Sequence, residues 1–376
     1  KGLLHKAKAY TMSSGKLAAI LYKEEMERAL KTPGISGYQL LDLHDFPGQG
    51  TALVGLLDAF WDSKDILPAA EFRQFSAPVV PLLQFAKAVY TNNETFEASI
   101  DVSNYGQEVL KNQGISWFLK DGGKIIEQGH FQSTIGKGHQ GHVGHLEVPL
   151  QAIGQAKKLT IQLKLEGTSY ENHWNIWVYP QQLAVDFGDV SYTRDLAEAM
   201  RLLKDGKKVL LNPDWKKING IEGKFVPVFW SPVHFPKQAG TMGLLCDPKH
   251  PVFADFPTDN HTDWQWWDLQ IKSTTLITDE IKGGNAIVEL IDNFANNRRL
   301  ASLFEGTVGA GKLMIASFDL EADLANRPVA RQLLGSILTY MNSTKFRPKV
   351  IENPAILSQV LRYKEAQEKS EPKAIY

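Results

Sequence analysis

The spacing of hydrophobic and polar positions divides the chain into three regions of different periodicity. In the first, residues 1–81, Tyr38–Leu43 predicts a buried strand that polar residues follow directly. In a (β/α)8 barrel, substrate-binding groups follow the strands in this way, and a strand needs neighbours to be buried. We therefore expect this region to be the C-terminal segment of a barrel whose other strands precede the chain. The 3.6-residue period also predicts three helices. The first is capped at Ser13 or Ser14 and ends near Lys31, and the other two cover 52–60 and 68–75.

The second region, residues 82–181, is predicted to be all-β. Apolar residues alternate with polar ones over 94–104, and Lys120–Gly123 has the composition of a hairpin turn. About seven short strands over ~100 residues favour an immunoglobulin-like β-sandwich. Because Cys246 is the only cysteine, the disulfide-linked type is excluded. The remaining strands are expected over 116–119, 124–128, 146–150, 159–165 and 174–179.

The third region, residues 182–345, alternates between helical and strand patterns. This alternation predicts a doubly wound α/β domain of the flavodoxin or class I amidotransferase type, with a mostly parallel sheet. Asn326 and Pro328 are expected to open its last helix, and residues 346–376 to form a charged, extended or partly helical tail. One helix is predicted over 195–204, and the last helix is predicted to end near Met341. The strands are predicted over 208–211, 226–230, 242–246, 286–291, 300–305 and 312–318.

Composition and charge exclude several classes of function. The net charge is −1, with 41 basic and 42 acidic residues, so nothing provides the positive field that nucleic-acid binding needs. No apolar run approaches the ~20 residues of a membrane span, and no signal peptide is recognisable at the start of this chain. A single cysteine excludes any multi-cysteine metal site. We expect neither a cofactor nor a metal.

The polar residues after the predicted barrel strand are the first candidate binding site. Asp42, His44, Asp45 and Gln49 lie where a barrel binds its substrate, and Asp42 and His44 share one side of an extended strand. They are candidates for binding sugar hydroxyls or for orienting a neighbouring catalytic carboxylate. The alternative is that Asp45 caps the turn and Asp42 anchors the loop.

The second candidate is an aromatic segment, Asn260–Trp267. Trp264, Trp266 and Trp267 have the character of a sugar-stacking platform, in a chain with 10% aromatic residues. The alternative, which we favour, is a hydrophobic seam between the third domain and its neighbours, since large aromatic residues dominate interfaces.

Three further patterns indicate structure rather than chemistry. His139, His142 and His145 stand among glycines that disfavour a helix, so a metal site is not expected. Cys246 lacks the glycine elbow of an amidotransferase nucleophile and is expected to be buried and structural. Gly306–Lys312 lacks the hydroxyl residue of a phosphate loop and is expected to be a turn between strands.

Several motifs resemble a known family. Ser36–Thr51 and the continuation Leu57–Lys64 resemble the eighth barrel strand and loop of bacterial family 2 glycoside hydrolase-like proteins of the β-galactosidase type. In the third region, the matching segments resemble the amidotransferase-like domain appended to this subgroup: Pro248–Pro251, Trp264–Trp267, Ile291–Asn293 and Asn297–Leu300.

This resemblance implies a glycosidase whose two catalytic glutamates follow the fourth and seventh barrel strands. The one Asn–Glu pair here, Asn93–Glu94, falls in the predicted sandwich, so both glutamates are expected upstream. The chain would then be the C-terminal portion of a periplasmic or extracellular bacterial glycosidase, inactive alone, with a carbohydrate and the N-terminal part of the same enzyme as partners. Asp42, His44 and Asp45 would line its sugar subsite. The alternative is a non-catalytic carbohydrate-binding or scaffold module.

Overall fold

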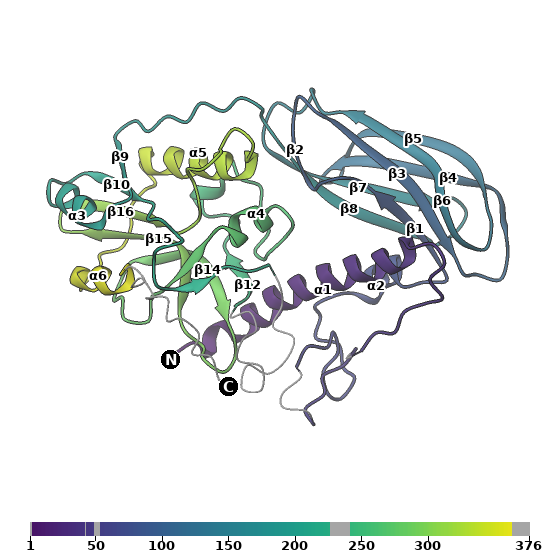
Figure 1. Ribbon diagram of the computed structural model, residues 1–376, viewed down its shortest axis with the longest axis horizontal. Coiled ribbons are helices and arrows are strands. Elements are labelled where there is room, and N and C mark those ends of the chain that lie inside the picture. The colour runs from purple at the N-terminus through teal and green to yellow at the C-terminus, as the bar shows by residue number, and fades with distance from the viewer. Residues whose placement is uncertain (1, 42, 49–52, 226–240, 363–376) are drawn as a thin grey trace, which may run out of the picture.

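The computed structural model describes residues 2–41, 43–48, 53–225 and 241–362 (Figure 1). These residues form three β-sheets and a few helices, arranged as an N-terminal helical segment, a β-sandwich and an α/β unit. None of the described helices has both the length and the hydropathy that a membrane span requires.

The N-terminal segment is dominated by one long helix, α1 (Ala7–Lys31), which follows a 3-10 turn, η1 (Leu4–Lys6). The caps predicted at Ser13 and Ser14 are wrong, because the helix begins six residues earlier with Ala7 and Lys8, both strong helix formers. The Ser13 hydroxyl instead donates to the backbone carbonyl of Asn260, 3.1 Å away. A short helix, α2 (Ala69–Phe75), lies within the stretch predicted over 68–75.

The described residues form no (β/α)8 barrel. Tyr38–Leu41 is not a strand, and the side chains of Tyr38 and Leu41 are 42% and 62% exposed. The described part of the helix predicted over 52–60 is also irregular; isolated bridges join Leu57 to His44 and to Ser63. A strand is stable only when neighbouring strands satisfy its backbone hydrogen bonds, and here none lies beside this segment in the described fold.

The β-sandwich consists of a three-stranded and a five-stranded sheet. Their inward side chains share one core, to which Phe96 and Ile100 contribute from one sheet, and Ile161 and Ile176 from the other. In chain order the strands are β1 (Val79–Gln84), β2 (Val89–Thr91), β3 (Thr95–Asn104), β4 (Leu110–Asp121), β5 (Lys124–Ile135), β6 (Gly138–Pro149), β7 (Lys157–Leu165) and β8 (Glu171–Tyr179). The sheet orders are β1-β3-β6 and β2-β8-β7-β4-β5.

The α/β unit is built on one branched sheet of order β11-β13-β15-β16-β10-β9, to which β14 and β12 are added beside β15. Its strands are β9 (Val190–Thr193), β10 (Lys208–Leu211), β11 (Ile221–Glu222), β12 (Thr241–Cys246), β13 (Thr274–Ile277), β14 (Asn285–Asp292), β15 (Leu300–Val308) and β16 (Gly311–Ala316). The strand predicted over 226–230 lies outside the described residues.

The doubly wound, mostly parallel arrangement predicted for this unit is wrong. Among the described strands of this unit, only β9, β10 and β16 pair in parallel, while β12, β14, β15 and β16 form an antiparallel series. The connections explain the difference. A parallel crossover needs a dozen or more residues, whereas β15 and β16 are joined by a tight turn in which Gly309 has a φ of +60°.

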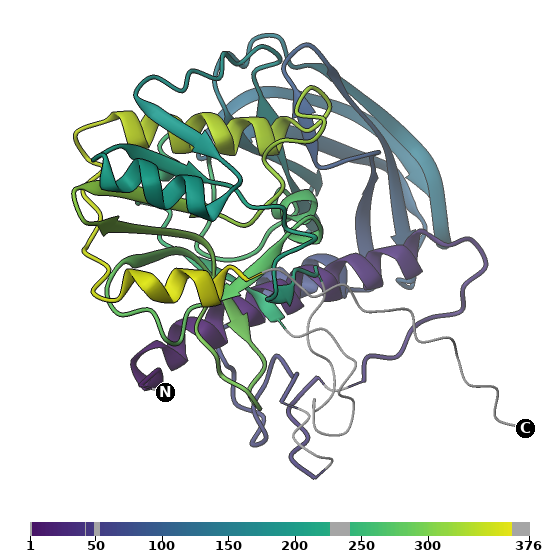
Figure 2. The ribbon, with the colours of Figure 1, turned by 60° about the vertical axis from the view of Figure 1, so that its left-hand side comes forward.

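Helices cover both faces of this sheet (Figure 1, Figure 2). Helix α5 (Pro328–Asn342) packs on the face that carries Leu210 and Met314, whereas α3 (Leu196–Lys204) packs on the face that carries Val209 and Leu313. The remaining helical elements are η2 (Pro251–Phe253), α4 (Trp266–Ile271), η3 (Pro354–Ile356) and α6 (Leu357–Val360).

The segment after residue 345 differs from the predicted tail. Phe346, Ile351 and Leu357 are buried in the two cores of the α/β unit, and Thr307 on β15 bridges to Val350. Residues 346–362 are therefore an integral part of this unit; the rest of the predicted tail lies outside the described residues.

Helix α1 is common to both halves of the molecule and runs beneath them in both views (Figure 1, Figure 2). Near its N-terminal end it packs on β12, where Leu17 lies against Gly243, and Lys6 pairs with Glu289 on β14. Near its C-terminal end, Leu30 shares a small core with residues of β1. This helix positions the sandwich relative to the α/β unit.

Candidate functional site

A cleft of about 710 Å³ opens where α1, the sandwich and the α/β unit meet. One wall is α1, the second is formed by the ends of β1 and β8, and the third by the loop that follows β12 in the α/β unit. Its lining is polar and aromatic, with the indoles of Trp174, Trp177 and Trp264 among the side chains. More than half of the lining residues are polar or charged. A hollow between structural units is a common place for a ligand.

Trp264 supplies one accessible aromatic ring of the cleft, beside the partly exposed Phe85. Trp264 is partly exposed, and one face stacks on Phe225, with ring centroids 5.2 Å apart and an interplanar angle of 28°. The other two indoles are held more firmly, since Trp174 is 8% and Trp177 is 1% exposed. Trp264 is thus a supported ring that can present a face to a ligand.

Two carboxyl groups of the loop after β12 line the cleft. Asp259 forms an ion pair with Lys158 on β7 and is partly exposed. Asp263 is 4% exposed, and burial raises its pKa to about 8, so this carboxyl is protonated at neutral pH. Its Oδ1 accepts from the backbone N–H of Gln265 at 3.2 Å, while Oδ2 has no hydrogen-bond partner among the described residues.

Two imidazoles of the cleft are neutral at pH 7. Burial lowers the pKa of His173 on β8 to about 4, and burial also lowers the pKa of His261. One ring nitrogen of each is engaged: His173 Nδ1 lies 2.7 Å from Gln74 Oε1, and His261 Nδ1 lies 2.9 Å from the carbonyl of Thr262. Each ring keeps Nε2 as a second polar group.

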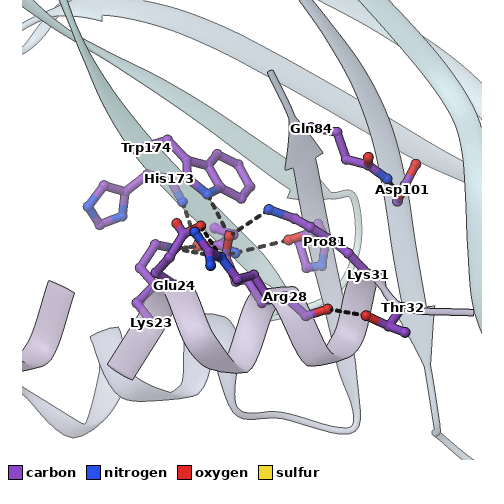
Figure 3. Close-up of polar contacts among 12 residues, drawn as sticks. Lys23, Glu24, Arg28, Lys31, Thr32, Pro81, Gln84, Asp101, His173 and Trp174 are labelled. Atoms are coloured by element: carbon purple, nitrogen blue, oxygen red, sulfur yellow. Dashed lines mark hydrogen bonds and ion pairs between the residues drawn. The ribbon is translucent and has the colours of Figure 1, made fainter. Parts of the chain in front are cut away.

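A buried carboxylate on α1, that of Glu27, lines the cleft, and Figure 3 labels three of the residues around it, Lys23, Lys31 and Trp174. Glu27 is 1% exposed and accepts hydrogen bonds from Lys23 at 2.6 Å, Lys31 at 3.2 Å, Trp174 Nε1 at 2.8 Å and Asn172 Nδ2 at 2.9 Å. Burial acts to raise the pKa of Glu27, but the two ammonium groups and these hydrogen bonds hold it below its usual value. The cluster fixes Trp174 and the wall of the cleft.

The predicted loop site lies away from this cleft. Asp42 and Gln49 are outside the described residues. Asp45 is buried, and its Oδ1 accepts from Lys64 Nζ at 2.6 Å and from the Gly55 N–H at 3.0 Å, which are the contacts of a loop anchor. The ring of His44 lies 4.4 Å from that of Trp61. The sugar-binding role of His44 and Asp45 stays a prediction.

The three predicted tryptophans do not form one surface. Trp264 lines the cleft, but Trp266 is fully buried, with Phe318 among its neighbours and its indole N–H bonded to Thr258 Oγ1 at 2.9 Å. Trp267 is 49% exposed and does not line the cleft. Trp266 therefore has no face with which to stack on a sugar, because it is part of the core.

Three sequence patterns were predicted to be structural: the histidines at 139, 142 and 145, Cys246, and Gly306–Lys312. Burial raises the pKa of the Cys246 thiol to about 12, which is unsuitable for a nucleophile. His139 and His142 are on β6 beside Asp101, and the described residues hold no group of His, Cys, Asp and Glu that could bind a metal. Gly306–Lys312 forms the end of the β15–β16 hairpin.

No functional role was predicted for Glu27, His173, Asp259 and Asp263. Asp259 directly precedes the aromatic segment Asn260–Trp267 and Asp263 lies within it, so their position near Trp264 was a usable signal. Glu27 carried none, because a glutamate with lysines four residues away on either side is typical of a solvated helix face.

Comparison with known families gives two partial matches. Residues 191–362 match a family described as Domain of unknown function (DUF8487), and residues 94–180 match a family described as Domain of unknown function (DUF8488). No curated protein matches the chain.

Solved structures show weak similarity. A CARDB domain from Pyrococcus furiosus is 13% identical, with 27% of this chain and 94% of that chain covered and a TM-score of 0.23. A β-glucosidase from Listeria innocua in complex with glucose is 10% identical, with 27% and 16% covered and a TM-score of 0.22. A Parabacteroides merdae β-glucuronidase is 12% identical, with 36% and 21% covered and a TM-score of 0.21. The chain therefore spans 16% of the length of the β-glucosidase and 21% of that of the β-glucuronidase.

Proposed function

We propose that this chain binds carbohydrate in the cleft between α1, the sandwich and the α/β unit. The observation that carries the proposal is the supported, partly exposed ring of Trp264 beside a protonated carboxyl and two neutral imidazoles. A pyranose has an apolar C–H face that stacks on an indole, and hydroxyl groups that both donate and accept hydrogen bonds.

Two buried polar atoms support a ligand of this chemistry. Trp177 Nε1 and Asp263 Oδ2 are shielded from solvent and have no hydrogen-bond partner among the described residues, and both residues line the cleft. A buried polar group without a partner costs about 1–3 kcal/mol. Both atoms are shielded from solvent, so a ligand hydroxyl reaches them only if the wall of the cleft shifts on binding. The hydroxyl would then accept from the indole N–H and from the protonated carboxyl.

We further propose that the chain is the C-terminal portion of a glycoside hydrolase of the β-galactosidase type, in the periplasm or outside a bacterial cell. The motif resemblance over 36–64 and 248–300 supports this proposal, and so does the strand order of the sandwich, which we interpret as immunoglobulin-like. The catalytic glutamates would belong to the N-terminal part of the enzyme, so this chain would bind sugar without cleaving it.

The segment 38–61 is the surface we assign to that N-terminal part. Its described residues include several large exposed apolar side chains, and exposed apolar surface commonly marks an interaction site. The large exposed side chains of this segment are Tyr38, Leu41, Phe46, Leu53, Phe60 and Trp61.

The test of sugar binding is a titration of the intact chain with galactose, glucose and glucuronic acid, followed by tryptophan fluorescence and calorimetry. We expect one of these sugars to bind and Trp264→Ala to lower its affinity tenfold or more, while Trp264→Phe keeps most of it. Trp267→Ala is the matched control, since Trp267 is exposed outside the cleft. Absence of binding for all three sugars, or equal loss in the control, would reject the proposal.

A further inference from the structure

A second hollow of about 760 Å³ lies on the outer face of the three-stranded sheet of the sandwich. It is lined by residues of β3 and β6 and by Gln84, Phe85 and Ala86 at the end of β1. The same three residues line the interdomain cleft. The two hollows therefore lie side by side, with segment 84–86 as their shared wall.

The floor of the second hollow is a polar row across three strands. Gln84 on β1 is paired with Ser99 on β3, and Ser99 is paired with His145 on β6. Directly paired residues of antiparallel strands present their side chains on the same face. The row thus combines an amide, a hydroxyl and an imidazole that point away from the sandwich core.

An irregularity in β6 adds a second imidazole to this surface. The register of β3 and β6 shifts between Ile100 and Val102, and His142 adopts a φ of +55°, which is rare for a residue with a side chain. Asp101 is fully buried and accepts the His142 N–H at 2.9 Å, while His142 Nδ1 lies 2.8 Å from Ser99 Oγ.

The irregular backbone of β6 is held in place by side chains around the buried carboxylate of Asp101. Gln84 donates to Asp101, and the His139 imidazole lies 3.7 Å from it, so the buried carboxylate holds both β1 and β6 (Figure 3 shows Gln84 and Asp101). Bulges of this kind commonly re-aim a side chain next to a functional site, and an unusual backbone conformation persists only where its surroundings enforce it. Here these contacts hold His142 in an exposed position beside Ser99.

We infer that the ligand is an extended saccharide chain, which begins in the interdomain cleft, passes over Ala86 and continues across the row of Gln84, Ser99, His142 and His145. This inference rests on the proposed function. Amide, hydroxyl and imidazole groups on a nearly flat sheet suit the alternating donors and acceptors of a polyhydroxylated chain. Ala86 is exposed and small, so it presents little obstacle between the two hollows.

The experiment compares affinity across sugar length. The intact chain is titrated with β-1,4-galacto-oligosaccharides and with β-1,4-gluco-oligosaccharides of increasing length, starting from the monosaccharide. We expect the affinity for the binding series to increase at least tenfold from the monosaccharide to the longer oligomers. In a double variant, His142→Asn with His145→Gln, this gain should disappear while monosaccharide affinity is unchanged. Asn is chosen at 142 because it tolerates a positive φ.

Controls separate the two proposals. His130→Gln changes an exposed imidazole on the other sheet and should leave every affinity unchanged. Equal affinity for all lengths, or an unchanged length gain in the double variant, would overturn the extended site and leave the sugar-binding cleft intact. If no sugar of any length binds, both proposals fail.

Discussion

The indole N–H of Trp174 on β8 donates a 2.8 Å hydrogen bond to the buried carboxylate of Glu27 on α1. The same carboxylate accepts from Lys23, Lys31 and Asn172. A single side chain therefore joins the long helix to the sandwich and holds the wall of the cleft.

Replacement of Glu27 by Gln should destabilise the protein by roughly 3–5 kcal/mol, because two lysines would lose their counter-ion in a buried site. Urea unfolding of both proteins measures the difference. Glu24→Gln is the control on the same helix: its pair with Arg28 is exposed, so the expected change is about 0.5 kcal/mol or less. Similar losses for both variants would contradict the role assigned to Glu27.

The raised pKa of Asp263 makes stability depend on pH. Between about pH 4 and pH 8 the folded chain retains a proton on Asp263 that the unfolded chain has released, so stability falls as the pH rises. The slope from one group is at most about 1.4 kcal/mol per pH unit.

Asp263→Asn removes this titration, so the variant should gain stability relative to the parent protein as the pH rises from 6.5 to 8. The depressed pKa of His173, about 4, acts in the opposite direction and costs stability only as the pH falls below about 6.5. The measurement is the free energy of unfolding at several pH values. A constant difference between the two proteins over this window would refute the assignment.

Gly283 lies at a close approach of two backbone segments. Its φ is +81°, and a Cβ at this position would lie 1.9 Å from the carbonyl oxygen of Val350. Gly283→Ala should therefore cost at least about 2 kcal/mol, through strain and through displacement of segment 350–351. Gly123 has open space around it, so Gly123→Ala should change stability by about 0.5 kcal/mol or less. Chemical denaturation of the pair checks the prediction.

Cys246 should react slowly with iodoacetamide at neutral pH. Its thiol is buried, donates to the carbonyl of Asp259 at 3.2 Å, and has a pKa raised to about 12 by burial. The thiolate is the reactive form, and it is scarce here. Mass spectrometry should show complete labelling only after denaturant is added. Rapid labelling of the native protein would indicate an accessible thiolate.

The strands β3 to β8 of the sandwich were predicted because their signal is local, whereas β1 and β2 were not. Phe96, Ala98 and Ile100 alternate with polar residues, and every second position faces the core. The segment 38–43 has an apolar composition of comparable strength, yet it forms no described strand, since pairing depends on neighbours that composition does not reveal.

The direction of the strands in the α/β unit was not predictable from hydrophobic pattern alone. A buried strand has the same composition in parallel and antiparallel pairs. The alternation of helices and strands therefore suggested the wrong strand direction. The connection lengths held the missing information, because only two residues separate β15 from β16.

The cleft was the least predictable feature, because its groups come from segments far apart along the chain. Glu27, His173 and Asp263 lie on a helix, a strand and a loop of different regions. Their burial, which lowers the pKa of His173 and raises that of Asp263, arises only when the three regions pack together. Trp264 was identified from composition, but its separation from Trp266 and Trp267 required the fold.

Helix α1 buries Leu17 beside Gly243 of the α/β unit and Leu30 in a small core with β1 of the sandwich. If either unit separates from the helix, it exposes apolar surface of its own. The unfolding of the two units is therefore coupled. Differential scanning calorimetry should accordingly record a single endotherm, with equal calorimetric and van't Hoff enthalpies, as expected when two lobes behave as one cooperative block.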